Sequence, residues 1–475
     1  MKKPAQYLAF DLGASQARSI LGTLHNDLFV MEVVHRFSTP LIEANGHLYW
    51  DLDAIWNELQ SGLKSALKRS ENLCSLSVSS WGVDYVPLDA GGNALRNPYS
   101  YRDGRTQDIV DEVHSKIPES VFFKQTGINS MPINTLYQVY WESRNDPDLF
   151  RKTACRLTMA DYFNYLFSGK MVTEKSLAST TQMLETGTGN WITKLLGQLG
   201  LSDDACPELV PSSTVLGKVK DHPFIHAVAS CSHDTACAVA TVSSISGGEK
   251  RAFLSSGTWS LLGVQRRDAI LTDEAFKAGF TNESGPGDSI RFLKNMTGLW
   301  VLQECEKEWK KAGERYTYDD LLNEARSFAA SGHVPSVDLS APQFSEPGDM
   351  IQKLFRSCSN KTDPIPQTRG ALVAVILKSL ANSYADTVKQ IHHITQEGID
   401  LIHIVGGGSK NRLLSQWTAD LSGCNVLTGP VEATAIGNIL LQARALGNMP
   451  SADNLKSALD TFEKATFYSP SPESR

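Results

Sequence analysis

The stretch YLAFDLGASQARSILGTLHNDLFVMEVV, residues 7–34, decides the fold class of this 475-residue chain. Its apolar runs at 7–10, 17–23 and 28–34 are separated by a glycine turn and by a polar break at 25–27. Such runs, bounded by turn residues, predict three short consecutive strands. A helix is expected to follow, because apolar residues recur every three or four positions, at Leu52, Ile55, Trp56, Leu59, Leu63 and Leu67.

The next expected strand, 76–79, completes the order strand, strand, strand, helix, strand, which is that of a ribonuclease-H-like half domain. A similar order begins near residue 251. Its strands and helices are expected at 251–254, 259–264, 372–388, 401–405, 412–421, 424–427 and 432–445. The chain is therefore predicted to be an α/β protein with two ribonuclease-H-like domains.

The chain is longer than a single hydrophobic core normally supports, so at least two domains are expected. A cluster of small residues within 236–248 predicts the boundary. The expected division is an N-terminal domain at 1–243, a C-terminal domain at 244–450, and a C-terminal helix and tail at 451–475. Residues 100–215 hold helices and loops beyond those that one ribonuclease-H-like domain needs, and these are expected to shape a substrate pocket.

The composition argues against several classes of protein. With 41% hydrophobic and 20% charged residues, the chain has the balance of a soluble globular protein. Its net charge of -7 argues against a nucleic-acid partner. No apolar run approaches the roughly 20 residues of a membrane-spanning helix, so no membrane partner and a cytoplasmic location are expected. The eight cysteines contain no Cys-x-x-Cys pair and are interpreted as small buried residues.

Asp234 is the strongest candidate for a catalytic residue. It stands in His233-Asp234-Thr235, after the apolar run 227–229, and in sequence it lies between two glycine turns that are typical of phosphate binding. Phosphoryl transfer to an alcohol asks a protein for positioning, charge stabilisation and one group that receives the hydroxyl proton. We therefore expect Asp234 to be that proton acceptor.

The glycine turns each have a structural alternative. Backbone amides after Gly13 could contact phosphate while Asp11 holds magnesium through water, or the segment could be a plain turn. The turn at 255–258 could hold the terminal phosphates of a nucleotide, or be a serine-rich hairpin. The triple glycine at 406–408 could lie against adenine or ribose, or be a close-packed turn. It fails the Gly-x-Gly-x-x-Gly pattern, because Asn411 replaces the third glycine.

Several motifs occur together and in order between residues 6 and 450: Asp11-Leu12-Gly13-Ala14-Ser15, Trp81-Gly82-Val83-Asp84, His233-Asp234-Thr235, Ser255-Ser256-Gly257-Thr258-Trp259-Ser260 and Val405-Gly406-Gly407-Gly408. Through them the chain resembles the FGGY family of carbohydrate kinases. The resemblance implies an actin-like ATPase fold, in which two ribonuclease-H-like domains close over a central cleft and the second domain holds most of the ATP.

The resemblance also implies roles for individual residues. Asp234 would be the proton acceptor. The sugar would be bound by Gly82, His233, Thr235 and Asn295. ATP would be bound by Ala14, Ser15, Gln16, Ala17, Arg18, Thr258, Gln303 and Gly407. Gln16-Ala17 stands where Ser-Gly usually continues this loop, so the amide geometry there is expected to differ.

Together these features predict a kinase that uses ATP and magnesium to phosphorylate the 1-hydroxyl of a ketose. A 6-deoxyketose is expected because its methyl group suits an apolar wall, for which Trp81 is a candidate. L-rhamnulose comes first and L-fuculose second, with other ketoses and polyols as further alternatives. From another class, an actin-like or chaperone ATPase would use the same fold without a sugar. The protein is expected to be a monomer or a homodimer.

Overall fold

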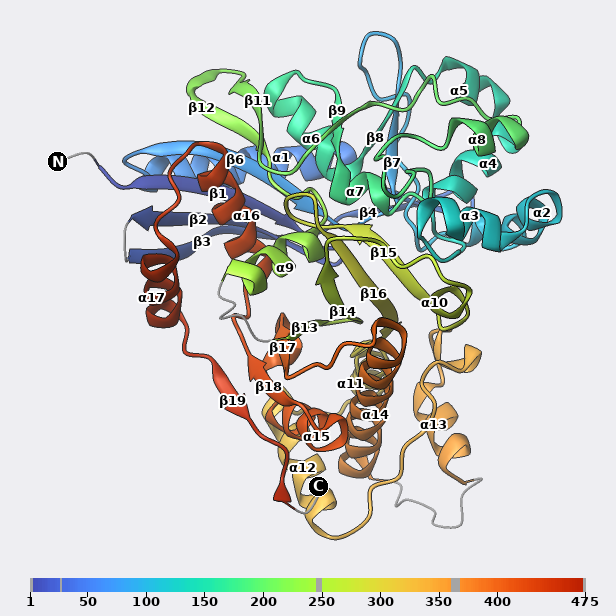
Figure 1. The fold of residues 1–475 in the computed structure, drawn as a ribbon, viewed down its shortest axis with the longest axis vertical. Coiled ribbons are helices and arrows are strands. Elements are labelled where there is room, and N and C mark those ends of the chain that lie inside the picture. The colour runs from blue at the N-terminus through green and yellow to red at the C-terminus, as the bar shows by residue number, and fades with distance from the viewer. Residues whose placement is uncertain (1–2, 26–27, 245–249, 360–367, 473–475) are drawn as a thin grey trace. The chain divides into compact units, whose positions relative to one another are not determined.

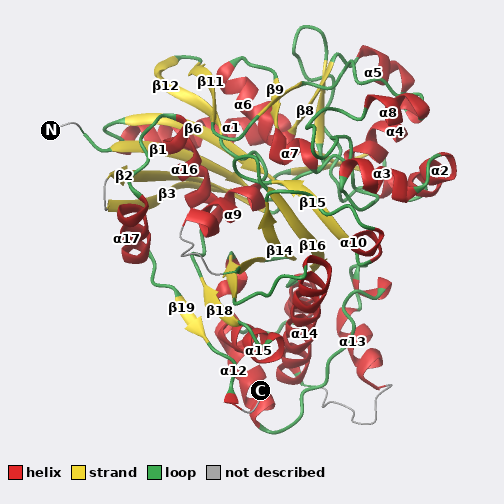
Figure 2. Ribbon diagram, in the orientation of Figure 1, coloured by secondary structure: helices red, strands yellow, loops and turns green. Residues whose placement is uncertain are grey.

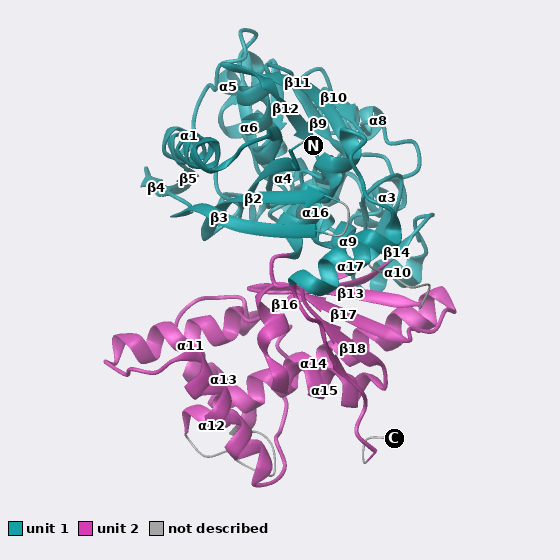
Figure 3. Cartoon of the chain, turned by 90° about the vertical axis from the view of Figure 1, so that its left-hand side faces the viewer, with its two compact units in different colours: residues 1–245, 265–292, 433–462 teal, residues 246–264, 293–432, 463–475 magenta. Residues whose placement is uncertain are grey.

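The structure is a computed structural model that describes residues 3–25, 28–244, 250–359 and 368–472. The chain forms two compact units (Figure 3). Unit 1 comprises residues 1–245, 265–292 and 433–462, and unit 2 comprises 246–264, 293–432 and 463–475. The predicted division into domains at 243 and 450 stays a prediction.

Unit 1 is built on a six-stranded sheet with the order β11-β12-β6-β1-β2-β3 (Figure 1). The bounds of its strands are β1 Ala5–Leu12, β2 Gln16–His25, β3 Leu28–Ser38, β4 Leu41–Ala44, β5 His47–Trp50, β6 Leu73–Ser80, β7 Tyr85–Leu88, β8 Cys155–Thr158, β9 Val172–Glu174, β10 Glu208–Val210, β11 Thr214–Val219, β12 His222–Ala229 and β15 Phe280–Ser284. The bounds of its helices are α1 Leu52–Arg69, η1 Gly104–Thr106, α2 Ile109–Lys116, α3 Glu119–Thr126, α4 Thr135–Asn145, α5 Pro147–Lys152, α6 Met159–Ser168, α7 Lys175–Ser179, α8 Thr193–Gln198, α9 Asp234–Ser244, α10 Asp273–Lys277, α16 Ala433–Ala445 and α17 Ala452–Phe462.

The strands predicted from residues 7–34 are confirmed as β1, β2 and β3, and each is longer than predicted. Strand β1 pairs antiparallel with β2 and parallel with β6. Successive side chains of a strand point to opposite faces of the sheet. Leu8 and Phe10 therefore pack into one core with α1, while Tyr7 and Ala9 pack into another with α16. The predicted helix is confirmed as α1, and Asp51 caps it by accepting from the Ala54 amide.

The domain boundary expected near 236–248 stays a prediction, and residues 236–244 of that stretch form most of helix α9. Small residues such as Ala236 and Ala240 let α9 pack closely rather than breaking it, and both are buried in a core cluster with Leu441 of α16. The rest of the expected boundary, including Ser246, Gly247 and Gly248, lies outside the described residues.

Helices α9 and α16 contact each other so closely that a methyl group added at Gly437 should lower the stability of the protein. A Cβ atom at Gly437 of α16 would lie 1.8 Å from the backbone oxygen of Cys237 in α9. We expect Gly437→Ala to destabilise the protein by about 1–3 kcal/mol, because the two helix backbones must separate. Activity should fall as well, since α9 begins at Asp234. Thermal unfolding measures the loss.

Gly197 provides the control for this substitution. It is the fifth residue of α8, a Cβ atom added to it would meet nothing within 4 Å, and it is not among the glycines with a positive φ. Gly197→Ala should keep or slightly raise the unfolding temperature. An equal effect of the two substitutions would contradict the packing argument.

Unit 2 contributes strands to a second sheet, whose order is β15-β16-β14-β13-β17-β18-β19. Figure 2 draws the strands in yellow and labels five of this sheet: β14, β15, β16, β18 and β19. The chain passes between the units within β14 and within β16. The bounds of the remaining elements are β13 Arg251–Ser256, β14 Trp259–Arg266, β16 Ile290–Thr297, α11 Trp300–Lys311, α12 Tyr318–Ala330, η2 Pro342–Phe344, α13 Met350–Ser359, α14 Arg369–Thr395, β17 Leu401–Val405, η3 Gly407–Lys410, α15 Arg412–Ser422, β18 Asn425–Thr428 and β19 Thr466–Tyr468.

The elements predicted for the second half are confirmed in type and order. Strand β13 pairs antiparallel with β14 and parallel with β17, as β1 does with β2 and β6. The turn that follows β1 and the turn that follows β13 therefore occupy equivalent places in the two sheets. Among the described helices, none combines the length and the apolar character needed to cross a membrane.

Candidate active site

Asp234 is the first residue of α9, and its side chain remains 30% exposed. Its Oδ1 accepts a hydrogen bond of 2.6 Å from the Thr235 amide and lies 3.4 Å from Nε2 of His233. Burial raises the pKa of the Asp234 carboxyl and the nearby charge of Asp11 adds to this, while His233 and the hydrogen bonds from Thr235 oppose it. A partly exposed carboxylate with a raised pKa is suited to accept a proton.

His233 is buried beside two charged residues of unit 1. Its Nδ1 lies 2.9 Å from Nη2 of Arg291 and 3.3 Å from Oε2 of Glu283. Arg291 and Glu283 also pair with each other at 2.8 Å. The position of the imidazole beside Asp234 is therefore fixed by an ion pair from β15 and β16.

Two buried carboxyl groups hold the backbone just before Asp234. Ser232 donates its hydroxyl to Asp161 at 2.6 Å and its amide to Glu174 at 2.9 Å. The His233 amide donates to the Ser176 hydroxyl at 3.2 Å, and that hydroxyl in turn donates to Glu174. Burial raises the pKa of Asp161 to about 7 and that of Glu174 above its usual value. These groups orient the loop that carries the candidate base.

The turn between β1 and β2 is tight and largely exposed. The Gly13 amide donates to the Gln16 carbonyl at 3.1 Å, and a Cβ at Gly13 would lie only 2.6 Å from that oxygen. Ser15 and Gln16 are exposed at the tip, whereas Ala17 is buried in β2. Nη2 of Arg102, which is otherwise exposed, donates to the Ser15 hydroxyl at 3.2 Å. Of the residues expected to bind ATP here, Ala14 and Ser15 thus lie in the turn, and Gln16, Ala17 and Arg18 lie in β2.

Asp11 lies near the end of β1 and has a cation beside it. Its Oδ2 is 2.6 Å from Nη2 of Arg18, its register partner on β2, and its side chain is 8% exposed. Within the described residues, no cluster of three or more His, Cys, Asp and Glu side chains could enclose a metal ion. Magnesium usually keeps several waters and binds one or two carboxylates together with substrate phosphates. A single carboxylate beside this turn fits that mode of binding.

The segment after β6 is held in an unusual backbone conformation. Val83 has a φ of 69°, which is costly for a β-branched residue. Its amide donates to the Thr180 hydroxyl at 3.1 Å, and a Cβ at Gly82 would lie 2.8 Å from the same oxygen. The close approach to Thr180 explains the glycine at 82, where the sequence predicts contact with the sugar.

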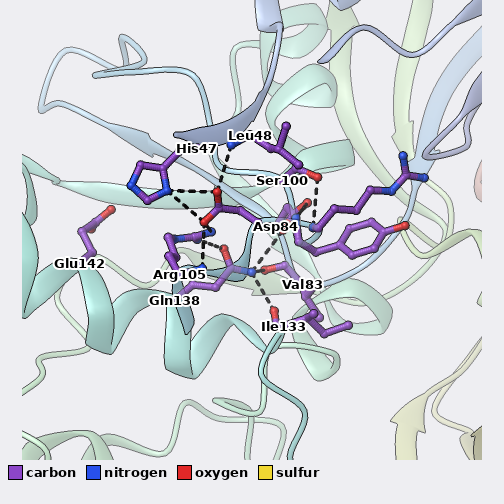
Figure 4. A network of polar contacts seen from close by, with 12 residues as sticks. His47, Leu48, Val83, Asp84, Ser100, Arg105, Ile133, Gln138 and Glu142 are labelled. Carbon is purple, nitrogen blue, oxygen red and sulfur yellow. Dashed lines mark hydrogen bonds and ion pairs between the residues drawn. The ribbon is translucent and has the colours of Figure 1, made fainter. Parts of the chain in front are cut away.

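Asp84 is completely buried in a network of donors, and Figure 4 shows the part of this network that contains Gln138. Its Oδ2 accepts from the indole nitrogens of Trp50 at 2.7 Å and Trp81 at 2.9 Å, and from the Tyr101 amide at 3.0 Å. Its Oδ1 accepts from Gln138 at 3.2 Å. Burial raises the Asp84 pKa to about 6 although these hydrogen bonds oppose it. The network fixes the Trp81 ring, which packs on Trp50 with centroids 4.3 Å apart.

In unit 2, two residues expected to bind ATP contact each other. The Thr258 hydroxyl donates to Oε1 of Gln303 at 3.2 Å. The turn that carries Thr258 is anchored on the start of α11, because the Leu299 amide donates to the Gly257 carbonyl at 2.8 Å. A Cβ at Gly298 would lie 2.6 Å from the same carbonyl oxygen. Gly298 therefore allows the turn and the helix to meet.

The triple glycine lies beside the same turn. Strands β13 and β17 are parallel neighbours, so the segments that follow them lie at one edge of the sheet. Gly406 has a φ of 82°, and a Cβ at Gly408 would lie 2.0 Å from the Ser256 hydroxyl oxygen. Gly407 is exposed at the start of η3. Asn295, which was expected to bind the sugar, is half-buried in β16 and belongs to unit 2, whereas Gly82, His233 and Thr235 belong to unit 1.

Comparison with known families accounts for nearly the whole chain. The N-terminal domain of the FGGY family of carbohydrate kinases matches residues 6–240, and the C-terminal domain of that family matches 252–446. The chain belongs to the FGGY family of carbohydrate kinases. It is accordingly a sugar kinase, and the family implies ATP as the phosphoryl donor.

Individual members of the FGGY family are similar over most of their length. The rhamnulokinase of Bacillus subtilis (strain 168) is 36% identical over 92% of this chain and 89% of its own. That of Bacteroides thetaiotaomicron is 35% identical over 98% and 96%. That of Lactiplantibacillus plantarum is 38% identical over 92% and 89%.

Solved structures of sugar kinases confirm the expected fold. Gluconate kinase from Lactobacillus acidophilus superimposes with a TM-score of 0.79 at 16% identity, covering 99% of this chain and 95% of its own. Plasmodium falciparum glycerol kinase with ADP gives 0.78 at 15% identity, covering 98% and 94%. The FGGY kinase described here thus has the two-domain actin-like ATPase fold.

Sequence reasoning did not assign roles to several residues of this FGGY kinase that surround the candidate base. Three of them were not considered for the site: Glu174, Glu283 and Arg291. Each is a charged residue in a predominantly apolar or extended stretch, a pattern that can indicate a buried and paired charge. Arg102 and Asp161 were noted only as parts of segments expected to shape a pocket. Their contacts depend on the folding of distant segments, which spacing along the chain does not report.

Proposed function

We propose that this enzyme transfers the γ-phosphoryl group of ATP to the 1-hydroxyl of L-rhamnulose. The observation that carries the proposal is the Asp234 carboxyl, which is partly exposed at the start of α9 and has a raised pKa. The three rhamnulokinases named above support the choice of sugar, because they resemble this chain over nine tenths of its length or more.

In the proposed reaction, Asp234 accepts the proton of the attacking hydroxyl. Thr235 and His233 flank the carboxylate, and Gly82 is partly exposed, so these residues are proposed to bind the sugar hydroxyls together with Asn295. A base that is held in place by its neighbours need not reorganise during the reaction.

The three glycine turns are all proposed to contact ATP. We propose that residues 14–18, at the turn between β1 and β2, and the pair Thr258 and Gln303 bind the phosphates, and that Gly407 approaches the nucleoside. Asp11 is proposed to hold magnesium through water. When bound, magnesium would neutralise charge on the phosphate oxygens. Because ATP is abundant in the cytoplasm, we place the reaction there.

One experiment distinguishes the proposed reaction from two alternatives, phosphorylation of L-fuculose and ATP hydrolysis without a sugar. L-fuculose differs from L-rhamnulose in hydroxyl configuration, and an actin-like ATPase would hydrolyse ATP without any sugar. ADP release should therefore be measured with L-rhamnulose, L-fuculose, D-xylulose, glycerol and no acceptor. We expect kcat/KM for L-rhamnulose to exceed that for each other acceptor by at least about tenfold, because a mismatched hydroxyl leaves buried polar groups unpaired.

Two results of this panel would count against the proposal. A preference for L-fuculose would overturn the assignment of the sugar and retain the kinase. Rapid ADP release that no sugar stimulates would overturn the kinase reaction itself. The phosphorylated carbon of the product, read by phosphorus NMR, checks the position of transfer.

A further inference from the structure

We infer that Arg291 fixes the neutral imidazole of His233 in the tautomer that carries its proton on Nε2. This nitrogen then donates toward Asp234 and the substrate hydroxyls beside it. Arg291 is thus a positioning residue that acts through His233. The consequence for the sugar rests on the proposed function, whereas the tautomer is a property of the protein alone.

The direction of the contact follows from the chemistry of arginine. Nη2 of Arg291 lies 2.9 Å from Nδ1 of His233, and the Arg291 side chain is 0% exposed. A guanidinium group has only donors and keeps its charge in proteins. Nδ1 must therefore accept the hydrogen bond with its lone pair. A neutral imidazole with an unprotonated Nδ1 carries its proton on Nε2.

Glu283 is the group that could favour the opposite tautomer. Its Oε2 lies 3.3 Å from Nδ1 of His233, and a proton on Nδ1 could point toward it. This oxygen lies closer to Arg291, at 2.8 Å. Burial alone would raise the Glu283 pKa, but the charge of Arg291 and its hydrogen bond hold this pKa below its usual value. Glu283 is therefore a carboxylate that balances Arg291 and leaves Nδ1 to the guanidinium.

The arginine is held so that it cannot easily turn away. Its Nε donates to the Ser284 carbonyl at 3.1 Å, which fixes the plane of the guanidinium on β15. The His233 backbone is fixed separately, because its amide donates to Ser176. Both partners of the contact belong to unit 1. The tautomer is therefore set by the fold of a single unit.

This arrangement gives the candidate base a neutral donor as its neighbour. Nε2 of His233 is 3.4 Å from Oδ1 of Asp234, longer than an ordinary hydrogen bond. The Nε2 proton and the carboxylate are consequently both available to a substrate. The histidine can donate to one sugar oxygen while Asp234 accepts the proton of a hydroxyl. The opposite tautomer would present a lone pair at Nε2 and repel the carboxylate.

Nitrogen NMR tests the tautomer directly in the ligand-free, full-length protein. With the histidines labelled with ¹⁵N, the His233 signals are those lost in His233→Gln. We expect a protonated Nε2 and an unprotonated Nδ1 in the wild type and in Arg291→Lys. In Arg291→Met the signals should move toward protonated Nδ1, because Glu283 then faces that nitrogen. A wild-type protein with its proton on Nδ1 would overturn the inference.

Kinetics provide the second readout. Arg291→Met should lower kcat/KM for the ketose by about tenfold to a hundredfold and leave KM for ATP within about twofold of the wild-type value. Arg291→Lys should retain part of the lost kcat/KM.

If Arg291→Met does not fold, His233→Gln and His233→Asn replace it. The Gln amide nitrogen lies near the place of Nε2 and the Asn nitrogen near that of Nδ1, so Gln should retain more activity. Equal activity, or more in Asn, would overturn the role.

The inference and the proposed function can fail separately. A wild-type protein that carries its proton on Nε2 but phosphorylates no ketose would contradict the proposed function and support the tautomer assignment. An active ketose kinase in which Arg291→Met changes neither the His233 signals nor kcat/KM would support the function and overturn the inference.

Discussion

Replacing Asp234 by Asn is expected to lower kcat by roughly a hundredfold to ten-thousandfold, the usual contribution of a general base. The amide keeps the size of the carboxyl but cannot accept the hydroxyl proton. Asp234 is 30% exposed, and its Oδ1 accepts from the amide and hydroxyl of the adjacent Thr235, so the fold should tolerate the change. The measurement is the rate of sugar-dependent ADP release at saturating ATP and ketose.

The matched control is Asp268→Asn, the same chemical change at an exposed position of unit 1. It should leave kcat within about twofold. Unfolding temperatures of both variants should stay close to that of the wild type. If Asp234→Asn retains near wild-type kcat while folded, Asp234 is not the base.

The pH profile of the wild type tests the same assignment without a substitution. The base must be ionised to accept a proton, so kcat/KM should fall as pH decreases through the pKa of Asp234. Burial and Asp11 raise this pKa above the ordinary value of 3.8. The acidic limb should therefore lie above pH 3.8, and it should be absent from the residual activity of Asp234→Asn. A limb at or below 3.8 would contradict the raised pKa.

Asp84→Asn is expected to cause the largest loss of stability, about 2–4 kcal/mol, because every partner of this carboxyl is a donor. Three N–H groups converge on Oδ2 and the amide of Gln138 points to Oδ1, as Figure 4 shows in part. An Asn side chain would place its own NH₂ against one of them. Gln138 cannot rotate to compensate, since its Oε1 accepts from Arg105 at 2.6 Å.

Urea unfolding followed by tryptophan fluorescence measures this loss, because two of the donors are indoles. Asp89→Asn is the control: Asp89 is only partly buried and accepts hydrogen bonds in a turn, so the substitution should cost less than about 1 kcal/mol. The folded pKa of Asp84, about 6, exceeds the ordinary 3.8, so its stabilising contribution is complete below pH 3.8 and is lost as pH rises through 6. The wild type should therefore gain stability over Asp84→Asn as pH falls. Equal losses in the two variants would contradict the network.

Local sequence patterns predicted the elements that depend on nearest neighbours. The apolar runs of residues 7–34 became β1, β2 and β3, and the helical spacing from Leu52 became α1. Residues 236–244 form most of α9 although they belong to the stretch in which the boundary was expected, because small residues in a local window are equally typical of a linker and of a tightly packed helix. Contact with α16, nearly 200 residues later in the chain, decided between them: Thr241 donates to the Ala433 carbonyl at 2.7 Å.

The sequence by itself determined the family, the order of strands and helices, and the identity of the candidate base, because these follow from residue types at short, fixed spacings. Only the tertiary structure decided what surrounds that base. The contacts of Arg291 with His233, and of Asp161 with Ser232, join residues 58 and 71 positions apart. Their geometry depends on where the fold brings β16 and α6 relative to the residues just before α9. The physical reason is that a side chain's partner is chosen by three-dimensional packing and desolvation, which no periodicity along the chain encodes.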